Sequence, residues 1–371
     1  ATPATLAPPP AFAALAAATP AFERGEHAQG LARLGDAPWP VLFEHVARHK
    51  CAGLLTRWLE AAANASLPVP NELFERARSE RMRAAWQAGR VLETAGDVRD
   101  RLQHGGIPAV FLKGAARLAA GQHDADAHYS GDVDVLVPRD RAGEAVAELR
   151  RAGYREHPAD DADDEGSHHH RARLFSPRRN VPVELHLALV SPKIVSAKLD
   201  YTSLSPFVRV VEGPLGQVSV LDDVRAAVHL AYHARDFRAW RDIVLLARML
   251  RTFDGGMRAA FEAVVRAERF DGVRVRSVVA VADLIAHGTA IGDARVRRYL
   301  RWALIREDLP RRLHRRSLVP EMLYGRFRRE VDVTFWRALN ELIALPAIVR
   351  HLRVRRAAGC ALFEREAIST R

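Results

Sequence analysis

The chain has 371 residues, of which 48% are hydrophobic, 27% charged and 7% aromatic, a composition typical of soluble globular proteins. Its length predicts two or three structural units. The two cysteines, Cys51 and Cys360, are too far apart in sequence for a zinc motif. A disulfide-rich scaffold is thereby excluded, and a reducing, cytoplasmic setting is expected. No stretch approaches about eighteen uncharged apolar residues, so no membrane span is expected.

The net charge of +11 is concentrated at one end of the chain. Residues 294–371 hold 19 arginines against 8 acidic residues, which accounts for the whole excess. Clustered arginines bind phosphates by releasing counterions, so this basic helical C-terminal region is a candidate RNA-binding segment. A solvated helical face or a surface for a protein partner is the alternative that the pattern leaves open.

The first hundred residues predict a leader followed by helices. Residues 1–20, with prolines at positions 8 to 10, are interpreted as a flexible leader. Apolar residues at helical spacing then predict a helical N-terminal region over residues 21–104.

A change of pattern after Gly106 predicts an α/β core over residues 105–221. We expect strands at residues 107–112, 133–137, 171–175 and 181–189, helices at 115–120 and 141–152, and a hairpin of 207–211 with 217–221. From Asp222, a helix cap, the helical period returns, giving a helical region over residues 222–293 and the basic region 294–371. The predicted fold class is α+β, with a small mixed-sheet core between helical N-terminal and C-terminal regions.

Three carboxylates in the predicted core point to a metal site. Asp132 and Asp134 alternate with valines in a short apolar strand, so both face the same side. Glu184 lies in a second apolar strand, where an acidic residue is unusual. Such carboxylates would repel one another unless a hard cation neutralised them, and oxygen ligands suit magnesium bound to nucleotide phosphates. The sequence therefore predicts a site for phosphoryl-type transfer.

Further residues near these strands are candidate substrate contacts. Lys113 and Gly114 form a turn between a strand and a helix, where backbone N–H groups can hold phosphate, although Lys113 is equally well explained as an exposed helix-start lysine. His186 follows Glu184 on the same strand face and is either a substrate contact or a structural histidine. His170 lies in a run of three histidines, for which a substrate contact, a zinc ligand and a polar strand edge remain open.

Two pairs of polar residues in the following helices are further candidates. His229 and His233 are four residues apart on one helix, either as ligands or as a polar face. Arg241 and Asp242 interrupt an apolar helix, where they either meet the cleft or form a buried ion pair.

The motifs Leu-Lys-Gly at residues 112–114, Gly-Asp-Val-Asp-Val-Leu-Val at 131–137 and Val-Glu-Leu-His at 183–186 resemble the nucleotidyltransferase superfamily with the DNA polymerase beta fold. They are similar in particular to a poorly characterised family with Leu-Lys-Gly, Gly-Asp-Ile-Asp and Val-Glu-Leu-His motifs, and distantly to the AbiEii-type toxin nucleotidyltransferases. The resemblance implies that Asp132, Asp134 and Glu184 hold the metal and are catalytic. It also implies that Lys113, Gly114 and Ser130 bind nucleotide.

Two positions depart from the toxin-like pattern. Ala115 stands where that pattern has a second glycine, and His128 stands where it has an arginine. These changes affect the expected triphosphate contacts more than the metal site.

The expected function is metal-dependent nucleotidyl transfer. With Mg²⁺ or Mn²⁺, a nucleoside monophosphate would pass from a nucleoside triphosphate to an acceptor hydroxyl, and pyrophosphate would leave. RNA is slightly favoured as acceptor because of the basic C-terminal region, with a small molecule or a peptide left open. The alternative is a catalytically silent nucleotide- or RNA-binding module, for example one half of a toxin and antitoxin pair.

Overall fold

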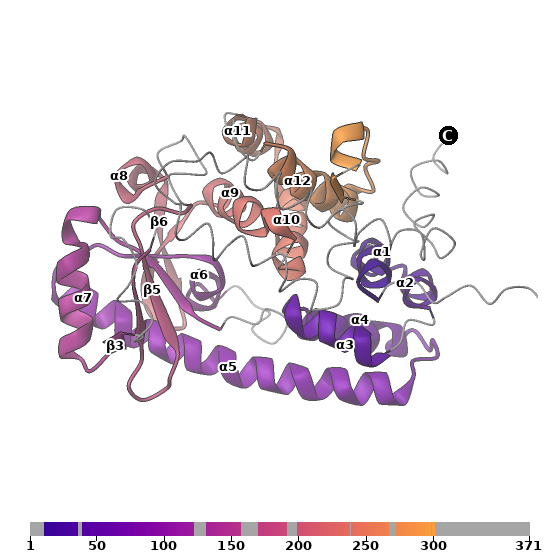
Figure 1. The fold of residues 1–371 in the computed structure, drawn as a ribbon, viewed down its shortest axis with the longest axis horizontal. Helices are drawn as coiled ribbons and strands as arrows, with labels where there is room; N and C mark the ends of the chain where they lie inside the picture. Colours follow the sequence, from indigo (N-terminus) through magenta and orange to yellow (C-terminus); the bar gives the residue numbers. More distant parts are fainter. Residues whose placement is uncertain are drawn as a thin grey trace, which may run out of the picture. The chain divides into compact units, whose positions relative to one another are not determined.

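The computed structural model describes residues 11–35, 39–121, 131–156, 170–190, 199–237, 239–266, 272–297 and 299–300 (Figure 1). The chain divides into two compact units, residues 1–45 with 290–371, and residues 46–289. The second unit contains the sheet and all the site residues described below. The five-part division expected from the sequence stays a prediction.

The first unit begins with packed helices. Helix α1 (Ala11–Glu23) contacts α2 (His27–Leu34), and α3 (Trp39–Arg48) follows. A Cβ atom at Gly30 would lie 2.7 Å from the Phe22 ring, so the two helices can approach this closely only with glycine there. The leader prediction is wrong for residues 11–20, which are helical and almost fully buried. Their alanine-rich sequence has high intrinsic helix propensity, which outweighs the proline run before it.

The second unit is built on a seven-stranded mixed sheet. Its strand order is β3-β4-β5-β2-β1-β7-β6, in which β2 pairs parallel with β5 and β1 pairs parallel with β7, while the other pairs are antiparallel. The strands are β1 (Val110–Phe111), β2 (Val133–Leu136), β3 (Arg155–Glu156), β4 (His170–Phe175), β5 (Pro182–His186), β6 (Val208–Gly213) and β7 (Gly216–Leu221).

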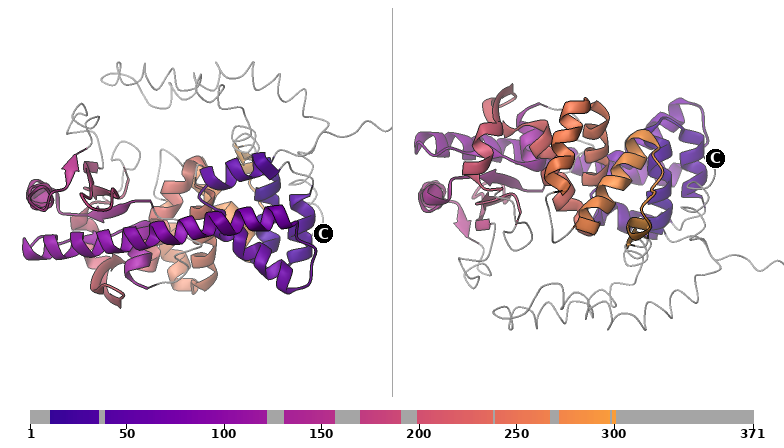
Figure 2. Two further views of the ribbon diagram at one scale, coloured as in Figure 1. Left: turned by 90° about the horizontal axis from the view of Figure 1, so that it is seen from below. Right: turned by 90° about the horizontal axis from the view of Figure 1, so that it is seen from above.

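One face of this sheet packs against helices to form the hydrophobic core. Val133 and Val135 of β2 and Val183 and Leu185 of β5 are fully buried in a cluster with residues of three helices. These helices are α5 (Asn71–His104), α6 (Lys113–Ala119) and α7 (Ala142–Arg151). Helix α5 is the long purple helix that crosses the left view of Figure 2. Because strand side chains alternate, the residues between these valines and leucines face the opposite side of the sheet.

Further helices complete the second unit: α4 (Ala52–Asn64), α8 (Tyr201–Leu204), α9 (Asp223–His233), α10 (Trp240–Thr252), α11 (Gly255–Arg266) and α12 (Gly272–His287). The Asp222 side chain accepts a hydrogen bond from the Arg225 N–H at 2.7 Å, which confirms the predicted cap of α9. Helix α9 contacts α6, α10 and α11, so the helical layer joins the core next to α6 (Figure 1). Within the described residues, no helix is long and apolar enough to cross a membrane.

The α+β fold class is confirmed, and so are the predicted strands in outline. The hairpin around Gly213 forms as β6 and β7, in register from Val208↔Leu221 to Gly213↔Gly216. The two-residue strand β3 was missed because so short a segment leaves no alternation to detect. Apart from residues 294–297 and 299–300, the basic C-terminal region lies outside the described residues.

Gly213 offers a direct test of the contact between the hairpin and α6. A Cβ atom added there would lie 2.0 Å from the carbonyl oxygen of Ala119, a backbone atom that cannot move aside cheaply. We expect Gly213→Ala to lower the free energy of unfolding by about 2 kcal/mol or more. Gly89→Ala, in open space within α5, should raise it by about 0.5 to 1 kcal/mol. Urea denaturation measures both, and equal effects would contradict the packing described.

Candidate metal and nucleotide site

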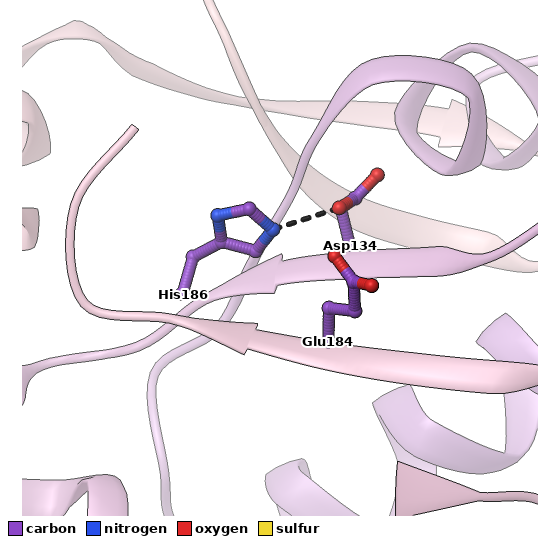
Figure 3. Close-up of side chains that lie close together, drawn as sticks. All are labelled: Asp134, Glu184 and His186. Atoms are coloured by element: carbon purple, nitrogen blue, oxygen red, sulfur yellow. Dashed lines mark hydrogen bonds and ion pairs between the residues drawn. The ribbon is translucent and has the colours of Figure 1, made fainter. Parts of the chain in front are cut away.

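Two parallel strands bring acidic and histidine side chains together on the face opposite the core helices. Asp134 of β2 lies directly beside Glu184 of β5 in the ladder, and His186 follows two residues later. One ligand atom from each of the three residues lies within 4.8 Å of the others (Figure 3). Two carboxylate oxygens and an imidazole nitrogen at this spacing can hold a divalent cation.

Asp134 is the centre of this arrangement. Its side chain is 2% exposed, and its Oδ1 atom lies 2.7 Å from His186 Nε2 and 2.9 Å from Lys113 Nζ, which donates to it. Burial alone would raise the pKa of Asp134, but the Lys113 ammonium and the His186 hydrogen bond lower it well below its usual range. Asp134 is therefore an ionised, fully enclosed carboxylate.

Lys113 supplies the positive charge at the site. It begins α6 with a φ of +49°, a left-handed conformation that is uncommon outside glycine. The backbone N–H of Leu112, just before it, donates to the carbonyl of Asp134 at 3.0 Å, so the turn is fastened to β2. Burial lowers the pKa of Lys113, but Asp134 and Asp132 raise it more, so the amine stays charged.

Glu184 differs from Asp134 in that its pKa lies near neutral. Burial, together with the negative charges of Asp134 and Asp132, raises its pKa to about 7. Arg173 on β4 opposes this shift and lies 3.3 Å from Glu184 Oε1. A metal ion at this site would displace the Glu184 proton and would therefore bind more tightly as the pH rises through 7.

His186 joins the site to the helical layer. Its side chain is 1% exposed, and burial lowers its pKa despite the neighbouring Asp134, so the ring is neutral at pH 7. The ring lies edge-on to His229 of α9 with 6.3 Å between centroids. Burial and the Lys113 charge lower the pKa of His229 well below its usual value.

The structure places the other predicted site residues as follows. Asp132 comes just before β2 and is near enough to influence the pKa values of Lys113 and Glu184. The three residues with ligand atoms within 4.8 Å of one another include His186 and not Asp132. Gly114 lies in the first turn of α6. Ser130 and the side chain of His170 lie outside what the structure describes.

A second polar cluster lies on α9 and α10, near this site. His233 Nδ1 lies 2.6 Å from Asp242 Oδ2, and Arg241 donates to Asp242 Oδ1 from Nε and Nη2 at 2.9 and 2.7 Å. Arg241 and Asp242 are buried, and the charge of Arg241 and the hydrogen bond with His233 lower the pKa of Asp242 despite its burial. Asp132 helps to raise the pKa of Arg241, so the ion pair lies within electrostatic reach of the carboxylates.

The sequence indicated the members of this second cluster but not the contact between them. The charged pair in an apolar helix and the histidine spacing were the signals, but they did not show that His233 and Asp242 are partners across two helices. The structure joins them because α9 and α10 pack side by side.

Comparison with known proteins identifies the family. Residues 35–270 match the model of a family described as uncharacterised nucleotidyltransferase, and the chain belongs to that family. A solved structure, that of an antigenic nucleotidyltransferase-like protein from Paracoccidioides brasiliensis, is 12% identical and covers 58% of this chain and 92% of its own. Its TM-score of 0.28 is too low to support any argument about the site. No curated protein matches the sequence significantly. The resemblance to AbiEii-type toxins stays a prediction.

The raised pKa of Glu184 predicts a pH-dependent cost to stability. The folded protein holds this proton more tightly than the unfolded chain does. The contribution of Glu184 to the free energy of unfolding therefore falls as the pH rises from about 4.5 to about 7. Glu184→Gln should therefore stabilise the metal-free protein by up to about 2 kcal/mol more at pH 8 than at pH 5. Chemical denaturation at both pH values measures this, with Glu212→Gln at an exposed position as control. A gain independent of pH would refute the assignment.

The buried ion pair on α10 makes a second prediction. Asp242→Asn leaves the Arg241 guanidinium buried beside a neutral amide, so we expect a loss of about 3 kcal/mol or more in unfolding free energy. Glu80→Gln, which breaks the exposed pair with Arg83, should cost less than about 1 kcal/mol. Urea denaturation of both variants gives the comparison, and similar losses would mean that Arg241 reaches solvent.

Proposed function

We propose that this protein is a metal-dependent nucleotidyltransferase that moves a nucleoside monophosphate from a nucleoside triphosphate to an acceptor hydroxyl. The observation that carries the proposal is the convergence of Asp134, Glu184 and His186, with ligand atoms within 4.8 Å, in a chain of a nucleotidyltransferase family. In the transfer, a bond forms between the acceptor oxygen and the α phosphorus. The bond from that phosphorus to the bridging oxygen breaks, and pyrophosphate leaves together with the hydroxyl proton.

The donor set fits a divalent cation. Asp134 and Glu184 offer carboxylate oxygens, His186 offers a neutral imidazole, and Asp132 is close enough to contribute further negative charge. A bound Mg²⁺ or Mn²⁺ would neutralise phosphate oxygens and acidify the attacking hydroxyl. The imidazole nitrogen favours Mn²⁺ over Mg²⁺, because Mg²⁺ prefers oxygen ligands.

The protein residues have separable tasks in this proposal. Asp134 stays ionised throughout the physiological range and fixes the position of the negative charge. Lys113, charged and held beside Asp134, would add positive charge near nucleotide phosphates at the turn that includes Gly114. Ser130 and His170 remain proposed nucleotide contacts on the sequence evidence alone.

The stability cost of the site argues against a silent binding module. Glu184 is held where its charge is unfavourable, which raises its pKa to about 7, and a protein without need of that charge gains by losing it. The silent module nevertheless has one observation in its favour, since the Lys113 ammonium already neutralises Asp134 without a metal. A transfer experiment separates the two.

The test is transfer of label from each α-labelled nucleoside triphosphate, with Mg²⁺ or Mn²⁺, into the RNA, protein and small-molecule fractions of a cell extract. We expect label in one fraction, and a loss of about a hundredfold or more in Glu184→Gln, because that variant removes a ligand charge. Glu184→Gln is the informative variant because it is expected to be more stable than the parent, so inactivity cannot be assigned to unfolding. Asp134→Asn should be inactive too.

Glu212→Gln is the matched control, since it removes an exposed carboxylate on β6. Full transfer by Glu184→Gln would overturn the proposed mechanism. Nucleotide binding without transfer by the parent protein would establish the silent module instead.

A further inference from the structure

The outer face of α5 carries an exposed aromatic and basic stripe, which we define as Arg78, Met82, Arg83, Trp86 and Arg90. Trp86 is 67% exposed and Met82 is 68% exposed, the highest values among the large hydrophobic residues of the described chain. Residues 78, 82, 86 and 90 recur every four positions, so they line one side of the helix. This face points away from the core, which α5 contacts through residues such as Ala88 and Val91.

The indole ring of Trp86 is restrained by a contact with Arg90. The Arg90 guanidinium lies over it, 4.5 Å from the ring centroid. Arg90 also donates to the Gln87 side-chain oxygen at 3.0 Å, which restrains the guanidinium. An exposed tryptophan with one face against an arginine keeps a preformed surface for stacking a second flat group.

The same contacts lead from Trp86 to the strand that carries the acidic site. Gln87 Nε2 donates to the carbonyl oxygen of Gly131 at 3.5 Å. Gly131 directly precedes Asp132 and β2. Trp86 is therefore linked through Arg90 and Gln87 to the backbone that enters the candidate metal site.

The charge of the stripe limits what it can bind. It holds three arginines and no carboxylate, and although Arg83 pairs with the neighbouring Glu80 at 2.7 Å, its side chain remains 75% exposed. A flat stacking surface flanked by guanidiniums matches a nucleobase with its phosphates, because bases stack on tryptophan and phosphates pair with arginine. An apolar protein surface would leave the arginines without partners.

We propose that this stripe binds the single-stranded RNA acceptor of the transfer reaction, with a base stacked on Trp86. The inference rests on the proposed function for its link to catalysis, but the RNA binding itself does not need transfer. It is also independent of the basic C-terminal region, which lies outside the described residues.

The test is the affinity of the full chain for a fluorescently labelled oligouridylate of about ten nucleotides, a length in the range of known single-strand sites. Trp86→Ala should weaken binding about tenfold or more, while Trp86→Phe, which keeps a stacking ring, should retain most of it. An RNA duplex should bind more weakly than the single strand, because its bases are already stacked. Arg90→Ala should also weaken binding, because Arg90 packs on Trp86. Its charge-matched control, Arg155→Ala on the exposed edge strand β3, should leave binding unchanged.

Two outcomes would overturn the inference: no RNA binding by the parent protein, or equal binding by the parent and Trp86→Ala. If Trp86→Ala instead turns a dimer into a monomer on size-exclusion chromatography with RNA affinity unchanged, the stripe is a subunit interface and the inference is wrong. Asp134→Asn separates the two proposals. This variant should lack transfer but bind RNA as the parent does. RNA binding through Trp86 by a parent protein that shows no transfer would disprove the proposed function and leave RNA binding by the stripe intact.

Discussion

The parallel pairing of β2 with β5 is the constraint on which the candidate site depends. It sets Asp134 directly beside Glu184 and Leu136 beside His186, and the alternation of the strands then sends the valines into the core and the acidic side chains to the other face. A shift of one residue in this register would bury the acids among apolar helices. The hydrophobic face therefore fixes the geometry of the polar face.

On the polar face, burial makes the protonation states of Asp134 and Glu184 depend strongly on the charges beside them. Asp134 keeps its charge because Lys113 and His186 contact the same oxygen atom, whereas Glu184, with weaker compensation, has a pKa raised to about 7. Two carboxylates in similar surroundings thus differ in protonation because their partners differ. A cation bound at such a site would stabilise the charged form of Glu184.

Helix α5 has two roles on its two sides. Its inner face contributes to the core beneath the sheet, and through Gln87 it contacts the residue that precedes Asp132. Its outer face carries the Trp86 stripe. Under the two proposals above, this single helix of 34 residues would hold an acceptor in a fixed relation to the carboxylates, as transfer to a large substrate requires. Helices α9 and α10 pair His233 with Asp242, which also binds Arg241. Asp132 helps to raise the pKa of Arg241, so this cluster lies within electrostatic reach of the carboxylates.

The sequence alone determined the α+β class, the main strands and the carboxylates, because alternation and helical periodicity are local properties that survive in a single chain. Asp134 and Glu184 were recognisable for the same reason, as acids in apolar strands. The tertiary structure decided what lies around them: His186 joins the two carboxylates, Lys113 contacts Asp134, and His233 pairs with Asp242. These contacts join residues 9 to 52 positions apart, and the distance between such residues depends on strand register and helix packing, which no local pattern encodes.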